Sequence, residues 1–522
     1  MNYTLLRQGL MAGIGLLSIH CAAEVVPAAP RIDVSLPPKL QADAAGRLLV
    51  FVERDRGGPA PQNIDAKIAP DSAVAGRDVA TFGPARRATI DLDLAEASRP
   101  FATLPPGRYR AQAVLDRNAD YARSGRGAGD LVSNIVSIEL PLRRSVSIAL
   151  DHEPPHRDLW NSAELPQKTR ALRAAARPYL TSVEIPSPSL TQFWGRPMSL
   201  RAWVLVPPQY DPAGPRTWPV VYRCGEFPAN AEWDLDAASL IAEGNAAAAM
   251  PPLIWVFLDY ATATGATEFV DSVNNGPWAR ALLTEFIPAV EQRFRTDAHP
   301  FGRFLTGRSS GGWSALWLQV HHPDVFNGAW VAAPDPSDFR DFVGIDLYAP
   351  NANLFYDERR KVRPLARVKG QVVVTIRDAV AMEDALGHTG GQFGSFDWVF
   401  SPRGPAGVPL RMFDHVTGAV DAGVVSYWRE HFDIARSIES LPATAKLKLD
   451  GKVRLAVGDE DTFYLDGSAR RLQSAMTAAG VAAEFRFLPG KTHYDIWERD
   501  GDPVAELKDM ARSMYAVARP RK

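Results

Sequence analysis

One stretch of the sequence, residues 302–323, limits the possible folds more than any other. It begins with the short apolar run "GRFLTG", which is typical of a buried strand. Apolar residues then recur at helical spacing until a proline ends the pattern; they are Trp313, Leu316, Trp317 and Val320. Between the two patterns the chain reads "GRSSGG". The sequence therefore predicts a strand that turns sharply into a helix.

From about residue 181 onward, apolar strand-like runs alternate with helical patterns. The expected strands are 200–207, 218–224, 253–259, 302–307, 328–334, 371–376, 452–458 and 484–490. A helix is expected over 279–294. Apolar strands that alternate with helices are typical of a mostly parallel central sheet covered on both faces. Residues 181–520 are therefore predicted to form an α/β domain.

The residues before this domain follow a different pattern. A chain of 522 residues is long for one domain, so at least two are expected. Between residues 31 and 150, glycines and prolines separate short β-rich runs at 46–55, 88–94, 107–116 and 136–142. This pattern predicts a small β-sandwich-like domain of the immunoglobulin-like or transthyretin-like kind. Residues 151–180 are expected to form a linker with a lead-in helix.

Residues 1–23 show the order of features found in a secretory signal peptide. Arg7 precedes a short apolar run, and small residues follow near Ala23. The apolar run is too short to span a bilayer. We therefore expect cleavage near Ala23 and a periplasmic or secreted protein without a membrane span. Lipid attachment at Cys21 is a weaker alternative, because bulky His20 precedes it, and a mildly apolar tail is another.

Charge and cysteine content narrow the classes of function. The formal net charge is −2, and no basic run is interleaved with aromatic residues, so nucleic acid is not expected as a partner. The chain has 2 cysteines, and Cys224 stands alone if Cys21 leaves with the signal. A disulfide framework is therefore excluded.

The "GRSSGG" turn matches a nucleophile elbow, G-x-S-x-G, in the register Gly307 to Gly311. A register centred on Ser310 would put the long side chain of Arg308 where a small residue is needed. Ser309 is thus the predicted nucleophile, and Ser310 would lend its backbone N–H to an oxyanion hole. The alternative is an ordinary glycine-rich turn.

A serine hydroxyl needs a base, and on this type of fold the partners follow in the order serine, acid, histidine. His493 lies just beyond the last expected strand. The preceding strand runs into "DEDTFYLDG", which offers Asp459, Asp461 and Asp466. Asp461 is preferred as the acid, because it lies a few residues past the strand end, and Asp459 is the reserve.

Other site residues are expected in loops near the same sheet edge. A second oxyanion donor is expected after the strand at 218–224, from the amide of Glu226 or Phe227. The loop "NNGPW" could contribute Asn275 and Trp278 to the substrate pocket, with helix capping and packing as the alternative. Arg308 is expected in that pocket as well. An insert over about 380–440 would form either a lid or pocket wall, or a simple packing excursion.

No metal or cofactor is expected. "HEPPH" at 152–156 has the spacing of a zinc motif, but consecutive prolines do not fit inside a helix. "DRNADY" at 116–121 begins like a calcium loop, but it lacks the glycine and the final glutamate of such loops. A proline-rich linker and a turn with solvated acids are the better interpretations.

Several motifs together resemble a known family. "TGRSSGGWSALWLQ", "GDEDTFYLD" and "GKTHYDIW" are similar to the Putative esterase family, which is related to S-formylglutathione hydrolase (esterase D), enterochelin esterase, and feruloyl and acetylxylan esterases. The resemblance covers roughly residues 180–515. It implies an α/β-hydrolase with Ser309, Asp461 and His493 as catalytic triad. This chain departs from many relatives in having Arg308 before the serine and "RCGEFPAN" in place of a His-Gly-Gly-type loop.

From these observations we expect an exported serine esterase that acts on a small-molecule or carbohydrate-linked ester through an acyl-enzyme. An acyltransferase or a peptidase with the same triad is the nearest alternative. A binding module that keeps the fold without catalysis is a third.

Overall fold

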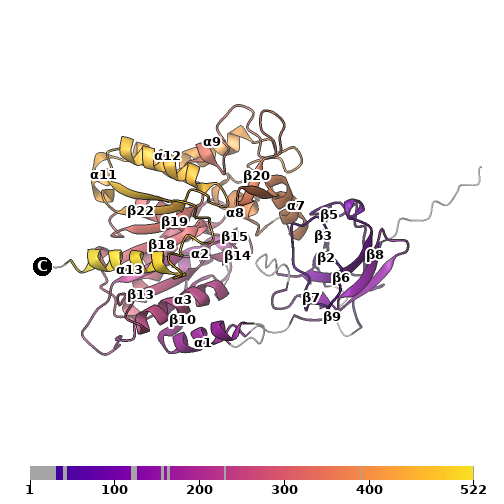
Figure 1. Ribbon diagram of the computed structural model, residues 1–522, viewed down its shortest axis with the longest axis horizontal. Coiled ribbons are helices and arrows are strands. Elements are labelled where there is room, and N and C mark those ends of the chain that lie inside the picture. The colour runs from indigo at the N-terminus through magenta and orange to yellow at the C-terminus, as the bar shows by residue number, and fades with distance from the viewer. Residues whose placement is uncertain are drawn as a thin grey trace, which may run out of the picture.

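The computed structural model describes residues 31–38, 44–118, 126–154, 158–160, 165–228, 231–387 and 389–520. The signal peptide expected over 1–23 lies outside these residues. Figure 1 shows the N-terminal strands as one body, beside a larger body that contains all the strands from β10 onward.

The N-terminal body is a nine-stranded sheet in the order β4-β1-β9-β7-β6-β2-β3-β5, with β8 paired to β6. Its strands are β1 (Ile32–Ser35), β2 (Gly46–Arg54), β3 (Ser72–Val79), β4 (Arg87–Ile90), β5 (Glu96–Ala97), β6 (Gly107–Asp116), β7 (Leu131–Ser133), β8 (Val136–Leu140) and β9 (Val146–His152). Side chains alternate between the two faces along β2. Leu48 and Val50 enter the domain core, whereas Leu49 and Phe51 belong to a separate apolar cluster on the opposite face.

The larger body contains an eight-stranded sheet in the order β10-β11-β13-β12-β18-β19-β22-β23. Its strands are β10 (Leu180–Pro186), β11 (Ser199–Leu205), β12 (Val220–Cys224), β13 (Ile254–Asp259), β18 (Arg303–Ser309), β19 (Ala329–Pro334), β22 (Val453–Gly458) and β23 (Ala483–Leu488). Neighbours from β13 to β23 are parallel, while β11 pairs antiparallel with β10 and with β13. Every residue of β12 and β19 is buried. The carboxyl ends of the parallel strands consequently share one edge, where ligands bind in folds of this class.

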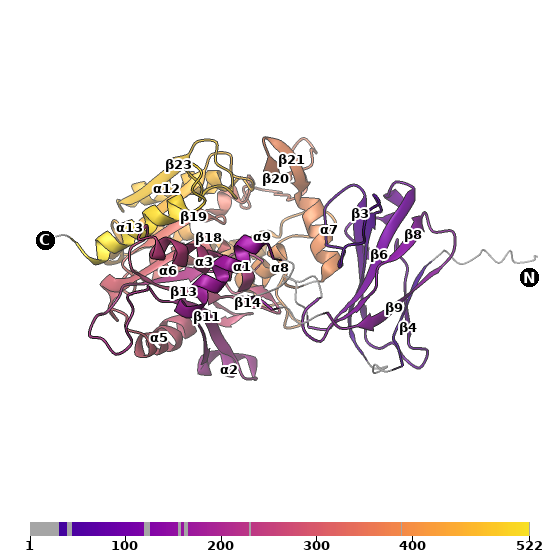
Figure 2. The ribbon, with the colours of Figure 1, turned by 60° about the horizontal axis from the view of Figure 1, so that its bottom comes forward.

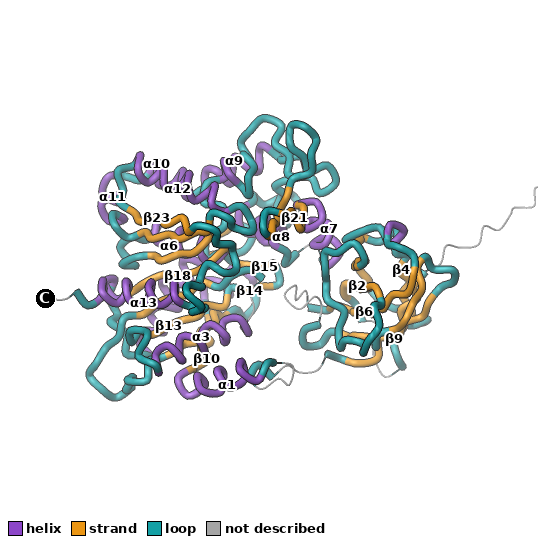
Figure 3. The backbone as a smooth tube through the Cα atoms, viewed as in Figure 1, coloured by secondary structure: helices purple, strands orange, loops and turns teal. Residues whose placement is uncertain are grey.

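Helices pack around the sheet, as the tube in Figure 3 shows. They are α1 (Gln167–Ala176), α2 (Pro188–Trp194), α3 (Ala231–Ala246), α4 (Trp278–Ala281), α5 (Ile287–Arg293), α6 (Ser310–His321), α7 (Ile376–Leu386), α8 (Gln392–Phe400), α9 (Ala422–His431), α10 (Ile434–Ser440), α11 (Ala443–Leu449), α12 (Leu465–Ala478) and α13 (Ala505–Ala518). The helix predicted over 279–294 is present, with a π-helical segment, Leu282–Phe286, between α4 and α5. None of the helices in the described ranges is long and apolar enough to cross a membrane.

The segment 371–376 does not join the central sheet, although its sequence predicts a strand there. It forms β21 (Gln371–Thr375), which pairs antiparallel with β20 (Pro364–Val368) in a separate hairpin. Val372 and Val373 are 54% and 49% exposed. Short strand pairs are also formed by β14 (Ala261–Thr262) with β15 (Gly265–Ala266), and by β16 (Asp271–Ser272) with β17 (Gly276–Pro277).

Between β19 and β22 the chain therefore forms a long insertion, which contains this hairpin and α7 to α11. The insert expected over about 380–440 lies within it. Its aromatic side chains are packed against one another, for example Phe400 against Trp428 with ring centroids 5.2 Å apart. Residues of α7 and α8 also line the cavity described below. The aromatic residues of this insertion thus pack against one another, and α7 and α8 also form part of the pocket wall.

Candidate active site

The serine turn connects β18 to α6. Ser309, the last residue of β18, has φ +54° and ψ −129°, a sparsely populated conformation for a residue with a side chain. Its glycine neighbours permit close backbone approach. A Cβ on Gly307 would lie 2.2 Å from the carbonyl oxygen of Gly311, and one on Gly311 would lie 2.2 Å from that of Gly225. The glycines are therefore needed because backbone segments fill the space where side chains would be.

The two adjacent serines have different environments. Ser309 lines a cavity of about 340 Å³. Ser310 is completely buried, and its hydroxyl donates to Oδ2 of Asp335 at 2.7 Å. Of the two hydroxyls, that of Ser309 is the one positioned to meet a substrate.

His493 and Asp461 are paired beyond the ends of the last two strands. Nδ1 of His493 lies 2.9 Å from Oδ2 of Asp461, and both side chains are buried. The backbone N–H groups of Phe463 and Leu465 donate to Oδ1 of Asp461 at 2.8 and 3.3 Å. With the Nδ1 hydrogen directed at this carboxylate, Nε2 of His493 is left to accept a proton. His493 lines the same cavity as Ser309.

The other two acids that the sequence offered have different partners. Asp459 is exposed, and its carboxylate accepts from the backbone N–H of Gly490 at 2.7 Å. Asp466 forms ion pairs with Arg470 at 3.7 Å and with Arg367 at 3.9 Å. Asp461 is therefore the acid that contacts the imidazole of His493, whereas Asp459 stabilises a turn.

Asp335 is a site residue that the sequence analysis missed. The Ser309 hydroxyl donates to Oδ1 of Asp335 at 3.0 Å, and Nε2 of Gln392 donates to Oδ2 at 3.1 Å. Burial raises the pKa of the Asp335 carboxyl, although the serine hydroxyls oppose that shift. The signal in the sequence was an acid directly after β19, the strand that neighbours β18.

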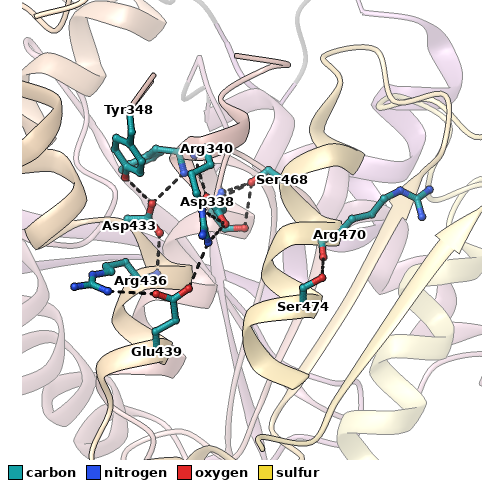
Figure 4. A network of polar contacts seen from close by, with 11 residues as sticks. Asp338, Arg340, Tyr348, Asp433, Arg436, Glu439, Ser468, Arg470 and Ser474 are labelled. Carbon is teal, nitrogen blue, oxygen red and sulfur yellow. Dashed lines mark hydrogen bonds and ion pairs between the residues drawn. The ribbon is translucent and has the colours of Figure 1, made fainter. Parts of the chain in front are cut away.

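The loop that follows Asp335 is anchored by a polar network (Figure 4). Oγ of Ser468, on α12, accepts the backbone N–H groups of Ser337 and Asp338 at 2.8 and 3.0 Å. Oδ2 of Asp433 accepts the hydroxyl of Tyr348 at 2.6 Å. These contacts tie the chain after β19 to α12 and to the N-terminus of α10, and so fix the position of Asp335.

Arg308 and Glu226 form an ion pair in the cavity wall. Nε of Arg308 donates to Oε2 of Glu226 at 2.6 Å, and Nη2 of Arg223 donates to Oε1 at 2.7 Å. Burial by itself would raise the pKa of Glu226, but the two guanidinium groups outweigh it and lower that pKa. Nη1 of Arg308 also donates to the carbonyl oxygen of His493 at 3.2 Å. Arg308 therefore lines the cavity and connects the loop after β12 to the loop that carries His493.

The loop after β12 lies where the sequence placed it. Glu226 and Phe227 both line the cavity that contains Ser309, and Ser310 opens α6 directly after Ser309. Cys224, at the end of β12, is buried and is not in a disulfide.

Asn275 and Trp278 lie elsewhere than the sequence analysis suggested. Asn275 is fully buried, its amide donates to the carbonyl oxygen of Ala266 at 3.3 Å, and its Oδ1 accepts from Thr264 at 2.9 Å. The indole of Trp278 donates to the carbonyl oxygen of Asn275 at 2.8 Å. Neither residue belongs to the described wall of the Ser309 cavity. Their observed role is to hold this loop and to pack, which was the alternative.

The cavity wall is largely apolar. Its aromatic members are Phe227, Trp233, Phe342, Phe393, Phe396, Phe463 and Tyr494. Met382 and Leu365 add aliphatic surface, and Ile68 comes from the N-terminal domain. A concave, apolar site with few polar groups around a nucleophile is typical of a small-molecule site.

The two motifs with metal-like spacing fall partly outside the described residues. Within the described parts of the chain, no three histidine, cysteine, aspartate or glutamate side chains are grouped so that they could hold a metal ion. His152 ends β9 and contacts its neighbour Asp151, while 155–156 lie outside the described residues. The last three residues of "DRNADY", 119–121, also lie outside them.

Comparisons with known proteins identify a family. The family model described as "Putative esterase" matches residues 195–500. Solved structures similar to this chain include a ferulic acid esterase (14% identity, 64% of this chain and 98% of the other, TM-score 0.38). An S-formylglutathione hydrolase from Agrobacterium tumefaciens is similar at 15% identity, over 65% of this chain and 94% of the other (TM-score 0.37). The fluorophosphonate-binding serine hydrolase FphF of Staphylococcus aureus is similar at 12% identity, over 65% and 98% (TM-score 0.35). No curated protein matches the sequence.

Proposed function

Because the chain belongs to the Putative esterase family, we propose that it is an exported serine esterase with an α/β-hydrolase domain and a β-sandwich-like N-terminal domain. Ser309 is the nucleophile, His493 the general base and Asp461 the residue that orients the imidazole. The observation that carries this proposal is the placement of Ser309 and the Asp461-paired His493 in one apolar cavity. Export rests on the signal-like residues 1–23.

The first step is attack by Ser309 Oγ on the ester carbonyl carbon. The hydroxyl must first leave Asp335, to which it donates in the resting site. His493 Nε2 then takes the proton as the C–O bond forms, and the Asp461 carboxylate stabilises the resulting imidazolium. The strained backbone at Ser309 presents its Oγ to the cavity before the substrate arrives.

The negative charge that develops on the carbonyl oxygen needs preorganised donors. The backbone N–H of Ser310 is suitable, because it lies at the start of α6, where the free N–H groups and the helix dipole favour an anion. The second donor is the amide of Glu226 or Phe227. The ion pairs of Glu226 with Arg223 and Arg308 hold that loop in place and neutralise its carboxylate near the developing oxyanion.

Collapse of the tetrahedral intermediate expels the alcohol, which takes the proton from His493, and leaves an acyl-Ser309. Water then attacks with His493 again as base, releases the acid and restores the serine. No cofactor takes part in these steps. The apolar wall favours a neutral ester with an apolar acyl group.

Hydrolysis of p-nitrophenyl esters from acetate to octanoate by the mature chain tests the proposal. Turnover that is lost in Ser309→Ala supports it, and no turnover across the series favours a binding module. Addition of an alcohol or amine acceptor separates hydrolysis from acyl transfer, since a transferase gives the acylated acceptor in place of the free acid. A panel of acetylated and feruloylated sugars then identifies the natural class of ester.

A further inference from the structure

Helix α7 lies between the two domains and touches both (Figure 2). Its Met382, Ala385 and Leu386 belong to an apolar cluster with Leu49, Phe51 and Val74 of the N-terminal sheet. Ala379, Met382 and Glu383 line the cavity of Ser309, so Met382 contributes to both. The helix is therefore a pocket wall that also packs on the N-terminal domain.

The carboxyl end of α7 is held by one arginine of that domain. Nε of Arg47 donates to the carbonyl oxygen of Ala385 at 3.1 Å, and Nη2 donates to that of Asp384 at 2.6 Å. A cation at a helix C-terminus also interacts favourably with the helix dipole. The fit is close, because a Cβ on Gly76 of β3 would lie 2.0 Å from the carbonyl oxygen of Ala385.

Glu383 connects α7 to α8, whose first residue contacts the partner of Ser309. Its carboxylate accepts the backbone N–H groups of Gln392 at 2.8 Å and of Phe393 at 3.1 Å, at the start of α8. Phe393 lines the cavity, and the Gln392 side chain donates to Asp335, the partner of Ser309. An unbroken series of contacts thus runs from Arg47 through α7 and α8 to the reacting serine.

The N-terminal domain also reaches the cavity directly. Ile68, in the loop before β3, is half-buried and lines the cavity together with α7. An aliphatic side chain there offers no hydrogen bond, so it can only limit the space and shield an apolar group from water.

We propose that the N-terminal domain forms part of the acyl-binding site, where Ile68 supplies a wall and Arg47 positions α7, so that this domain limits the size of the acyl group. The inference rests on the proposed esterase activity of Ser309. It identifies the occupant as a neutral, apolar acyl chain, because Ile68, Met382 and the aromatic side chains make most of this wall apolar, with Glu383 and Gln392 as polar members. Arg47 acts only through α7 and is a positioning residue.

The test compares kcat and KM for p-nitrophenyl acetate and octanoate in the full chain. Ile68→Trp fills the space and should lower kcat/KM for octanoate about 10-fold or more through KM, with acetate changed by less than about 2-fold. Arg47→Ala should shift the ratio of kcat/KM for acetate to kcat/KM for octanoate in the same direction. Arg47→Lys still donates to the carbonyls, so it should restore part of the wild-type ratio. Leu94→Trp and Arg87→Ala, on exposed positions of the same domain, serve as matched controls and should leave the ratio unchanged.

Labelling of each variant by a small fluorophosphonate keeps the two claims apart. Labelling of Ser309 that persists together with a shifted ester ratio supports the proposal. Normal labelling with an unchanged ratio in both Ile68→Trp and Arg47→Ala overturns it and leaves the esterase intact. Absence of labelling in the wild type overturns the esterase and, with it, this inference. Ile68 packs against the apolar cluster of Leu49, Phe51 and Val74 without being one of its buried members, so the thermal unfolding midpoint of each variant is measured beside the ester ratio. Ile68→Ala, which removes volume and should favour octanoate over acetate, gives the same test if Ile68→Trp or Arg47→Ala fails to fold.

Discussion

The hydroxyl of Ser309 donates to the carboxylate of Asp335 at 3.0 Å. The same carboxylate accepts from Ser310 and Gln392. A hydrogen bond to an ionised group contributes more than one between neutral groups, so an ionised Asp335 competes with His493 for the hydroxyl. The Ser309 hydroxyl is therefore restrained, and the proposed attack requires that this bond be broken.

Asp335→Asn should speed the reaction of Ser309 above neutral pH. The amide keeps the shape and one acceptor but removes the charge, so labelling by a fluorophosphonate should accelerate about 3-fold to 10-fold. The pH dependence of labelling should flatten in this variant, because the carboxyl that faces Ser309, Ser310, His493 and Gln392 no longer titrates. A loss of labelling beyond about 10-fold would show that Asp335 assists the reaction.

Asp461→Asn should abolish most of the activity. An amide at this position does not orient the imidazole or stabilise its charged form, and such changes cost about 10⁴-fold in kcat. Asp459→Asn is the matched control, because Asp459 holds a turn and does not contact His493. The measurement is kcat for a p-nitrophenyl ester. An equal loss in the two variants would contradict the assignment of the acid.

Glu383 makes the stability of the protein depend on pH. Burial raises the pKa of its carboxyl to about 7 from an ordinary 4.5, against the opposing effect of the backbone N–H groups of α8. Between these values the folded protein keeps a proton that the unfolded chain has released, so stability falls as pH rises through this window. Relative to Glu383→Gln, the wild type should lose about 3 kcal/mol of unfolding free energy between about pH 4 and about pH 8.

Urea unfolding of the two proteins at both pH values measures this difference. Glu358→Gln is the control, because that side chain is 91% exposed. A gap between wild type and Glu383→Gln that stays constant with pH would contradict the effect of burial.

Gly311→Ala should damage the nucleophile turn. Its Cβ would lie 2.2 Å from the carbonyl oxygen of Gly225 and 2.4 Å from that of Cys224, and backbone atoms at these distances must move. Overpacking of this kind costs about 1–3 kcal/mol, and the displaced loop is the one proposed to supply an oxyanion donor. The midpoint temperature of thermal unfolding and kcat should both fall. Gly423→Ala, in α9 with only the Asp421 side chain nearby at 3.2 Å, should be neutral or stabilising.

Local sequence patterns predicted the centre of the site because strand, turn and helix each have a short-range signature. The run at 302–307, the glycines around Ser309 and the helical spacing from Trp313 to Val320 all agree with β18 and α6. His493 and Asp461 could be placed by chain order, since they follow the last two strands of the sheet.

Features that depend on distant contacts could not be predicted in the same way. The valines of 371–376 have the composition of a central strand, yet they lie in an exposed hairpin, because composition does not say which partner a strand will find. The loop with Asn275 and Trp278 could have faced the pocket, but both side chains are buried and the indole of Trp278 donates to the backbone of Asn275. Asp335 contacts Ser309, and Arg47 contacts Ala385. The two partners of each contact are far apart in the sequence, so no local pattern indicates either contact.

Active-site labelling shows whether Ser309 is a nucleophile activated by His493. A fluorophosphonate should modify the wild-type protein at one residue, Ser309, as located by peptide mass spectrometry. Labelling should disappear in Ser309→Ala, fall strongly in His493→Ala and persist in Ser310→Ala. Labelling that persists in Ser309→Ala, or a wild-type protein that is never labelled, would contradict the account.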